Sequence, residues 1–310
     1  MTRLVVRGLS ALCLLSCACQ VVGGYDEFYA ATPTKSSPPP PAHACDALPL
    51  AKDDPAGFSV MARVDVPDGG CVWMDRTEAT VEQYQRWQSE VASDAIDWEP
   101  DWCKWKQTRA DPIGDPDDAC SAEILRYDLQ PFAPRKPMRC VDFCEAEAFC
   151  RFADKRLCYD PAGLGVQGPR GFPQEWQLAC TNGLTTRYPW GNPDEDVCNV
   201  GQSPAECIVG ASATCGPLPV GQKAKCVNDR GILDLTGNVA EWVFSCNFPD
   251  INAPQEPSGC LVRGGGYDAP LQTCDLELTV SNDTRTPSLG FRCCADLTPD
   301  EELLVKPIPR

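Results

Sequence analysis

The chain contains the stretch Gly231-Ile232-Leu233-Asp234-Leu235-Thr236-Gly237-Asn238-Val239-Ala240-Glu241-Trp242. Its apolar residues come in short runs separated by Asp, Thr, Gly and Asn, which are residues that favour turns. The same alternation of short apolar runs with Gly, Pro, Asn and Asp clusters extends from Gly171 to Asp296. This pattern lacks the period of long helices and predicts an irregular α+β fold.

Two kinds of regular element are expected before this region. Residues 59–66 alternate loosely with apolar side chains, and a Pro-Asp-Gly-Gly turn separates them from a second strand-like run at 71–75. Thr80 and Gln83 form a capping box that begins a helix with apolar residues at helical spacing. Asp142 begins a second helix in the same way. A hairpin and two helices are therefore predicted.

The composition restricts the compartment and the chemistry. The 310 residues include 21 Cys, 30 Pro and 24 Gly, with no repeat, and such a Cys content favours one disulfide-rich domain in an oxidising environment. The formal net charge of −17 argues against a nucleic-acid partner, because phosphate binding needs a dense Lys/Arg face. The one His, His43, lies in a Pro-rich stretch, which excludes His-dependent catalytic triads and zinc-protease sites within the chain.

The N-terminus resembles a secretory signal followed by a tether. Two Arg precede a short apolar run that is too short to span a bilayer. Leu14-Leu15-Ser16-Cys17 resembles the cleavage box of bacterial lipoproteins, which predicts lipidation of Cys17; an ordinary signal peptide is the alternative. We expect export across the inner membrane to the cell envelope or surface, with a lipid anchor as the membrane partner. The expected segments are a signal at 1–19, a Pro-rich tether at 20–44, a folded domain at 45–298 and a C-terminal tail at 299–310.

Eighteen cysteines lie between Cys45 and Cys294, an even number that predicts nine disulfides. The irregular, Asp- and Trp-rich segment 97–134 is predicted to be closed by a Cys103–Cys120 bridge. Cys246 and Cys260 are candidates for a local loop. A zinc site is disfavoured because tandem CxxC pairs are absent. Sequence spacing leaves the full connectivity open.

Five segments, in order, resemble the formylglycine-generating enzyme family, also called sulfatase-modifying factors. They are Met74 to Tyr84, Phe149 to Leu157, Glu175 to Asn192 with Glu-Trp-x-x-x-Cys and Tyr-Pro-Trp-Gly-Asn, Gly231 to Trp242, and Arg263 to Gly266 with Gly290-Phe291-Arg292. Together they cover about residues 60 to 296. The resemblance implies an FGE-sulfatase fold, related to C-type lectins, with two helices, twisted antiparallel strands and much irregular backbone.

The resemblance also implies where the oxidase chemistry would lie. Members with this activity bind copper through two Cys and oxidise a Cys of a client sulfatase; the matching positions here are Ala269 and Cys274. Gly266 replaces the Ser of the Arg-Gly-Gly-Ser motif, and Ala240 replaces a Trp. One thiol cannot supply the two thiolates that suit Cu(I), so copper binding is not expected. We refer to Ala240, Gly266, Ala269 and Cys274 as the groove residues.

Two disulfides are implied by the same resemblance. The first joins Cys150 to Cys293. The second joins Cys180 to a strand beyond the active thiols, but the matching position is Thr279, which makes Cys274 the nearest substitute partner.

A structural calcium site is implied at Asp234, Gly237, Val239 and Glu241. Calcium prefers hard oxygen ligands, partly from backbone carbonyls in a tight turn, and two carboxylates flank a Gly-Asn turn here. The alternative is that these carboxylates cap a turn without a metal. A second family site would begin at Asn199-Val200, but its later ligands are not recognisable.

These observations favour an FGE-like binding or structural domain without redox turnover of its own. One alternative is a divergent copper-dependent oxidase that uses another Cys, such as Cys294, to convert a protein Cys to formylglycine. The other is a lectin-like carbohydrate-binding protein, which rests on fold analogy alone. The expected partner is accordingly a protein or a glycan that the sequence does not identify.

Overall fold

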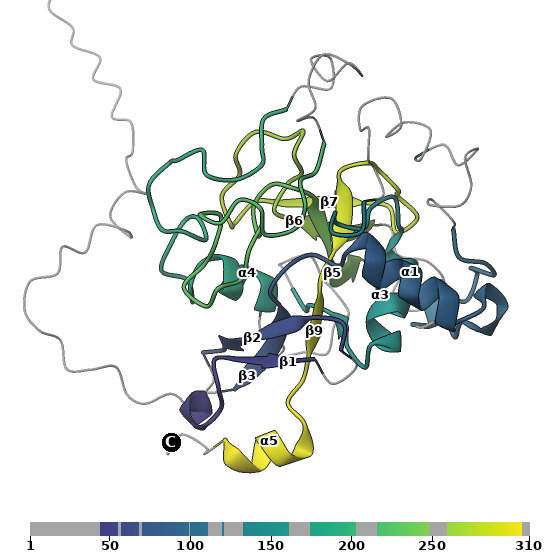
Figure 1. Ribbon diagram of the computed structural model, residues 1–310, viewed down its shortest axis with the longest axis horizontal. Helices are drawn as coiled ribbons and strands as arrows, with labels where there is room; N and C mark the ends of the chain where they lie inside the picture. Colours follow the sequence, from purple (N-terminus) through teal and green to yellow (C-terminus); the bar gives the residue numbers. More distant parts are fainter. Residues whose placement is uncertain are drawn as a thin grey trace, which may run out of the picture. The chain divides into compact units, whose positions relative to one another are not determined.

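The computed structural model describes residues 44–54, 57–67, 70–98, 100–110, 120, 133–160, 174–202, 216–247 and 259–305. The predicted signal segment with Cys17, and the predicted tether apart from Ala44, lie outside the described residues. The described residues form one compact unit of mixed helix and sheet, as predicted (Figure 1).

Two sheets organise this unit. The first is antiparallel and has the strand order β1 (Ala51–Asp53), β2 (Val60–Asp65), β3 (Cys71–Asp75), β9 (Cys293–Ala295) and β4 (Arg156–Leu157). The second has the order β7 (Glu277–Val280), β6 (Gly259–Arg263), β5 (Ala240–Asn247) and β8 (Leu289–Phe291), with β8 parallel to β5. The last strands of the chain therefore enter both sheets and connect them.

Four α-helices are described: α1 (Val81–Glu90), α3 (Phe143–Phe152), α4 (Glu175–Cys180) and α5 (Pro299–Leu304). The two predicted capping boxes are confirmed. The Thr80 and Asp142 side chains each accept a hydrogen bond from the backbone N–H three residues on, and the side chains of Gln83 and Glu145 accept one in return. These caps satisfy backbone donors that the first turn of a helix leaves unpaired.

The predicted hairpin is confirmed as β2 and β3, which pair in the register Ala62 to Met74. All five residues of β3 are buried, because the sheet is covered on both faces. Large aromatic side chains fill the space between α1 and α3. The Phe149 ring lies 5.9 Å from Trp87 and 5.3 Å from Phe291, centre to centre. Edge-to-face contacts of this kind add about 0.5–1.5 kcal/mol each to the burial itself.

The folded part continues beyond residue 298. Thr298 caps α5, and Glu301 of this helix accepts hydrogen bonds from Lys52 at 2.7 Å and from the Trp73 indole at 3.2 Å. The segment predicted as a tail thus includes a helix that contacts the hairpin.

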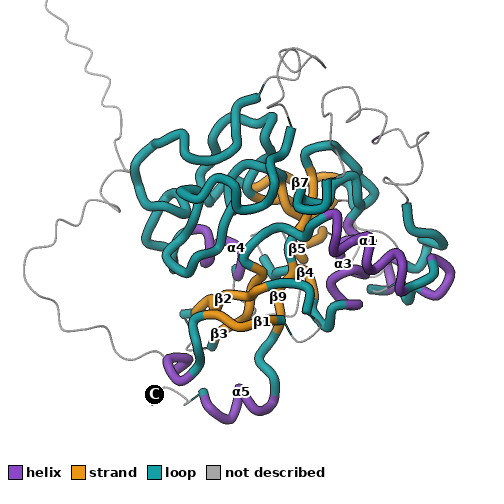
Figure 2. Tube along the Cα trace, in the orientation of Figure 1, coloured by secondary structure: helices purple, strands orange, loops and turns teal. Residues whose placement is uncertain are grey.

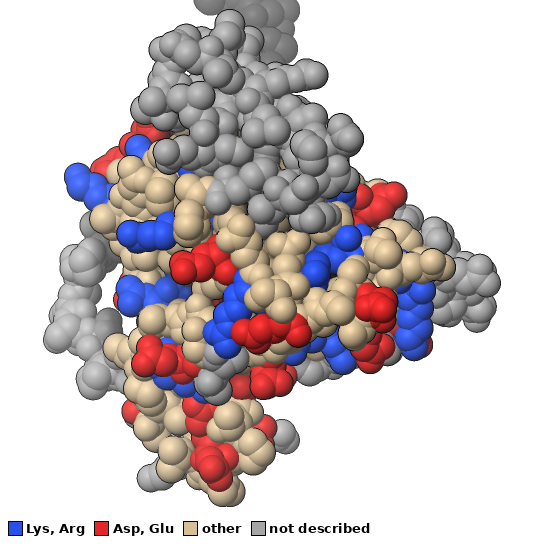
Figure 3. Space-filling view, turned by 45° about the vertical axis from the view of Figure 1, so that its right-hand side comes forward, with Lys and Arg blue, Asp and Glu red and all other residues tan. Residues whose placement is uncertain are grey.

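The described residues between α4 and β5 form loops and turns, and this region carries Asp234, Gly237 and Val239 of the predicted calcium site (Figure 2). Ala240 and Glu241 begin β5, and Gly266, Ala269 and Cys274 lie between β6 and β7. On the face shown in Figure 3, Lys and Arg side chains are interspersed with Asp and Glu and form no continuous basic surface. In the described part of the chain no helix has the length and apolar character that crossing a membrane requires.

Candidate functional site

The turn that leads into β5 carries the predicted calcium ligands. Asp234, Gly237 and Asn238 have positive φ angles of 57°, 78° and 60°. A Cβ on residue 237 would lie 2.5 Å from the carbonyl oxygen of Asn199, so glycine is required there both by φ and by the close approach of a second loop. The turn is therefore tightly packed, and its carbonyls are directed by unusual backbone angles.

Glu241 is engaged by two neighbours in the core. The Arg292 guanidinium donates to both of its oxygens, at 2.7 Å and 2.6 Å, and the Trp176 indole donates to Oε2 at 2.8 Å. Oε2 thus accepts two hydrogen bonds and Oε1 accepts one. Since each carboxylate oxygen has about two acceptor positions, only Oε1 retains capacity for another ligand.

A third carboxylate, Glu78, lies in the same cluster. It is fully buried, and its Oε1 accepts a hydrogen bond from the Asn238 side chain at 2.9 Å. Its Oε2 has no hydrogen-bond partner among the described residues. Burial, with the charge of Asp234, raises the pKa of Glu78 well above its ordinary value. Burial also raises the pKa of Asp234 to about 6.

These donors fit calcium in their chemistry. They are hard oxygens, and one guanidinium faces three buried carboxylates, which leaves negative charge that a divalent cation would balance. The three carboxylates do not converge within 4.8 Å of one another. A calcium ion at this turn would accordingly depend on backbone carbonyls, as the predicted ligand set does. Sequence reasoning missed Glu78 because it lies far from residues 234–241 along the chain.

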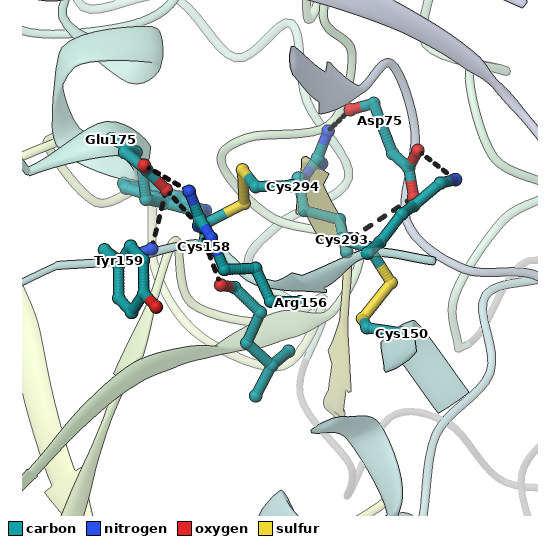
Figure 4. Close-up of a disulfide and its surroundings, with 12 residues drawn as sticks. Asp75, Cys150, Arg156, Cys158, Tyr159, Glu175, Cys293 and Cys294 are labelled. Carbon is teal, nitrogen blue, oxygen red and sulfur yellow. Dashed lines mark hydrogen bonds and ion pairs between the residues drawn. A yellow bond between two sulfur atoms is a disulfide. The ribbon is translucent and has the colours of Figure 1, made fainter. Parts of the chain in front are cut away.

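One trio of potential metal ligands does converge among the described residues. Atoms of Cys158, Glu175 and Cys294 lie within 4.8 Å of one another, and Figure 4 shows them together. The two sulfurs form a disulfide, however, and Arg156 pairs with both Glu175 oxygens at 2.7 and 2.8 Å. This trio is a structural centre, since the two sulfurs are bonded to each other and offer no thiolate to a metal, and the carboxylate is paired with Arg156.

The groove residues do not provide a thiol pair. Cys274, at the position of the second family thiol, is 1% exposed and forms a disulfide with Cys180. Ala269 has no sulfur, and its carbonyl oxygen accepts a hydrogen bond from the Gly201 backbone at 2.7 Å. Cys294, the alternative second thiol, is fully buried and bonded to Cys158.

The space around Gly266 is filled by other side chains. A Cβ on residue 266 would lie 2.7 Å from Cβ of Ser288 and 2.9 Å from Oδ1 of Asp268. Gly265 is similarly covered by Gln272, at 2.7 Å. The Ser of the family's Arg-Gly-Gly-Ser motif therefore does not fit at position 266 unless Ser288 or Asp268 is displaced. Ala240 begins β5 and is half-buried.

Three of the predicted disulfide pairings are present: Cys150–Cys293, Cys180–Cys274 and Cys246–Cys260. Three further bridges had no predicted pairing: Cys45–Cys71, Cys158–Cys294 and Cys198–Cys226. Cys207 and Cys215, on which a ninth bridge would depend, lie outside the described residues.

The predicted Cys103–Cys120 bridge is wrong. Cys103 is bonded to Cys144 in α3, and Cys120 to Cys140 just before it. Lys106, close to Cys103 in sequence, reinforces the first pairing, because it forms ion pairs with Asp142 at 2.5 Å and with Glu145 at 3.2 Å. These contacts hold the loop against the start of α3 rather than against its own neighbours in sequence.

The fold and these residues define the class of protein. Residues 61–297 match the family model of the sulfatase-modifying factor enzyme 1-like domain, also called FGE-sulfatase. The chain belongs to this family.

Several known proteins are similar to it. Over 185 residues it is 29% identical to a formylglycine-generating enzyme of Bos taurus, covering 54% of this chain and 46% of the relative. Over 187 residues it is 26% identical to that of Mycobacterium tuberculosis, covering 52% and 57%. It is also 26% identical over 180 residues to the inactive Cα-formylglycine-generating enzyme 2 of Bos taurus, covering 51% and 50%. The chain thus spans about half the length of the curated relatives it matches.

The structure of PvdO from Pseudomonas aeruginosa is similar in fold. It has a TM-score of 0.51 and 18% identity, with 80% of this chain and 98% of PvdO covered. This likeness concerns the fold alone. The eight disulfides of the described residues indicate an oxidising, extracellular or secreted environment.

Proposed function

We propose that this chain is a secreted or envelope-anchored FGE-family domain that acts as a binding or structural module without copper-dependent Cys oxidation. One observation carries the proposal: the Cys180–Cys274 disulfide removes the one thiol that the two family positions retain. The partner is a protein or a glycan outside the chain. One of its relatives is likewise named as inactive.

The chemistry supports this assignment. Cu(I) binds soft thiolates, and a sulfur in a disulfide is not a thiolate. Each described cysteine from Cys45 onward is disulfide-bonded, so the described residues offer no substitute pair. Side chains of Gln272, Ser288 and Asp268 also fill the space beside Gly265 and Gly266. Less room is therefore left there for a peptide Cys to be held in a reactive orientation.

The test is incubation of the purified chain with Cu(I), oxygen and a sulfatase-type Cys peptide, followed by mass spectrometry. The peptide mass is expected to stay unchanged. An active formylglycine-generating enzyme serves as the positive control, and thiol labelling of the native chain should detect no reactive pair among the described cysteines. Aldehyde formation that Cys274→Ser abolishes would overturn the proposal and establish the divergent oxidase.

A second variant sharpens the test. Ala269→Cys restores the missing family thiol, yet it should also leave the peptide unchanged, because Cys274 stays bonded to Cys180. Turnover by this variant alone would show that the disulfide opens during the reaction and that residue 269 is the only defect.

We further propose a structural calcium ion held by Asp234, Glu241 and the carbonyls of Gly237 and Val239. Bound there, the ion would neutralise the carboxylates that Arg292 leaves unbalanced and would fix the turn before β5. Lipidation at Cys17 is proposed as the anchor to the envelope, and both proposals are tested below.

A further inference from the structure

Strand β7 lies at an open edge of the four-stranded sheet. It pairs with β6 in the antiparallel register Val262 to Leu278, and within the described residues no other strand lies beside it. An edge strand of four residues directs about half of its backbone N–H and C=O groups outward. None of the described strands pairs with these groups, so within the described part of the chain they offer an edge to another strand.

The other sheet edges are shorter or covered. Strand β1 has three residues and carries Lys52, whose charge discourages pairing. Strands β4 and β8 have two and three residues, all buried. Among the described strands, β7 is therefore the longest edge; its residues include one charged side chain, Glu277, and no Pro, Lys or Gly.

The side chains of β7 suit a strand partner. Within β7 the residues alternate polar and apolar, so Leu278 and Val280 share one face, and Leu276 directly precedes the strand. Leu276 is 39% and Leu278 is 50% exposed, while Val280 packs against the core. The apolar face of β7 thus extends from the core into solvent without a cover from the described residues.

The disulfide nearest to β7 in sequence does not involve a residue of the strand. Cys180 is bonded to Cys274, which lies before β7, and Thr279 within the strand is exposed. In the family that the chain resembles, the bridging Cys stands at the position that matches Thr279. Because the bridge from Cys180 is at Cys274 instead, no disulfide joins β7 itself to α4.

The acidic residues around β7 indicate which kind of partner would bind there. Asp275, Glu277 and Asp283 are exposed on or beside β7, and Glu277 is balanced in part by Arg263 at 3.2 Å. A second copy of this chain would bring a formal charge of −17 against −17, which opposes pairing of two β7 edges. A basic, extended segment meets complementary charge at the same edge.

We propose that β7 binds an extended, basic peptide segment of a partner protein by strand addition, with apolar side chains of the peptide against Leu276 and Leu278. This inference rests on the proposed binding function and names its surface and the chemistry of its partner.

The test uses the whole chain and a fluorescein-labelled probe of sequence Lys-Val-Thr-Val-Lys-Val-Thr-Lys. Fluorescence anisotropy should show saturable binding, at least tenfold weaker for a probe with Glu in place of Lys or with Pro in place of the central Val. Leu278→Lys adds a repelling charge to an exposed site and should weaken binding at least tenfold. Thr279→Pro removes a backbone donor and should do the same. Leu184→Lys changes an equally exposed Leu elsewhere and should bind as the unaltered chain does.

Three results would overturn the proposal. The first is no saturable binding of the alternating basic probe. The second is equal binding by the unaltered chain and by Leu278→Lys, whose melting temperature verifies folding even if Thr279→Pro fails to fold. The third is a dimer in sedimentation analysis that Leu278→Lys dissociates, which would assign β7 to a second copy. None of these outcomes depends on the oxidation assay, so failure here leaves the proposed loss of catalysis standing.

Discussion

Glu147 in α3 is a buried carboxyl group without an ion-pair partner among the described residues. It is 3% exposed, and its Oε2 accepts a hydrogen bond from the Leu157 backbone at 2.8 Å. Burial raises its pKa from 4.5 to about 7, although this hydrogen bond and two Arg residues oppose the shift. The folded state therefore binds more protons than the unfolded state between about pH 4.5 and pH 7.

A pH dependence of stability follows. Because the pKa is raised on folding, stability is lost as the pH rises through this window, by about 3 kcal/mol for a shift of this size. The free energy of unfolding should fall between pH 5 and pH 8 by about that much more in the unaltered chain than in Glu147→Gln. Urea denaturation at each pH measures it, with exposed Glu302→Gln as the control. Parallel pH profiles for Glu147→Gln and the unaltered chain would contradict the assignment.

The calcium ion proposed at Asp234 and Glu241 should stabilise the folded state, since it binds that state alone. An ion present at about 100 times its Kd adds about 2.7 kcal/mol, so excess EDTA should lower the melting temperature measured by calorimetry. Asp234→Asn should reduce the effect of EDTA, because an amide oxygen is a weaker ligand than a carboxylate. A melting curve unchanged by EDTA, together with metal-free protein by elemental analysis, removes the ion.

The residues around the proposed calcium site were not equally predictable from the sequence. The positions of Asp234 and Glu241 in a Gly-Asn turn are a local pattern, and their flanking carboxylates could be identified from it. Glu78 joins them only through folding, by its hydrogen bond to Asn238. Arg292, which follows β8, meets Glu241 of β5 in the same way, through folding rather than through a local pattern.

At the scale of elements, two disulfides in parallel join β9 to the α3–β4 region. Cys293 and Cys294 are neighbours, and their partners Cys150 and Cys158 lie eight residues apart. With one bridge intact, removal of the other opens a loop of only about ten residues. Removal of both opens a much longer loop: Cys150 and Cys293 are 143 residues apart in sequence, and the Cys180–Cys274 bridge nested between them shortens the path only in part.

The two bridges should therefore act non-additively. Replacement of either pair by Ala should lower the free energy of unfolding by about 2–3 kcal/mol, as loop-closure entropy gives for a short loop. Replacement of both pairs should cost more than twice as much, because the second loss opens a long loop. Guanidinium denaturation of the three variants measures the coupling. Additive losses would mean that each bridge acts through local packing alone.

The helices and the hairpin were predictable because their signals are local. A capping box and an apolar period lie within a few residues of the helix that they define, as at Thr80 and Asp142. Disulfide pairing is not local: Cys103 pairs with α3, where Lys106 of the same loop also forms an ion pair with Asp142. The same reason explains why α5 could not be assigned to the folded part: its contacts with Lys52 and Trp73 are more than 200 residues away in sequence.

For the whole molecule, the proposed signal segment at 1–19 predicts attachment to a membrane through Cys17. Expressed with residues 1–19 in a bacterial host, the chain should enter the detergent phase, and mass spectrometry of its N-terminal fragment should find a diacylglyceryl group on Cys17. Cys17→Ser should move the chain to the aqueous phase, whereas Cys19→Ser, the matched control, should not. Equal partitioning of Cys17→Ser and the unaltered chain would contradict lipidation at this residue.

The sequence by itself determined the family, the α+β class, the oxidising environment and the absence of one family thiol at Ala269. These depend on residue identity, composition and short-range order, which are present before folding. Only the tertiary structure decided that Cys103 is bonded to Cys144, that Ser288 and Asp268 fill the space at Gly266, and that β7 has an open edge among the described strands. Each of these is a contact between segments distant in the chain, and such contacts are selected by the packing of the whole core rather than by any local pattern.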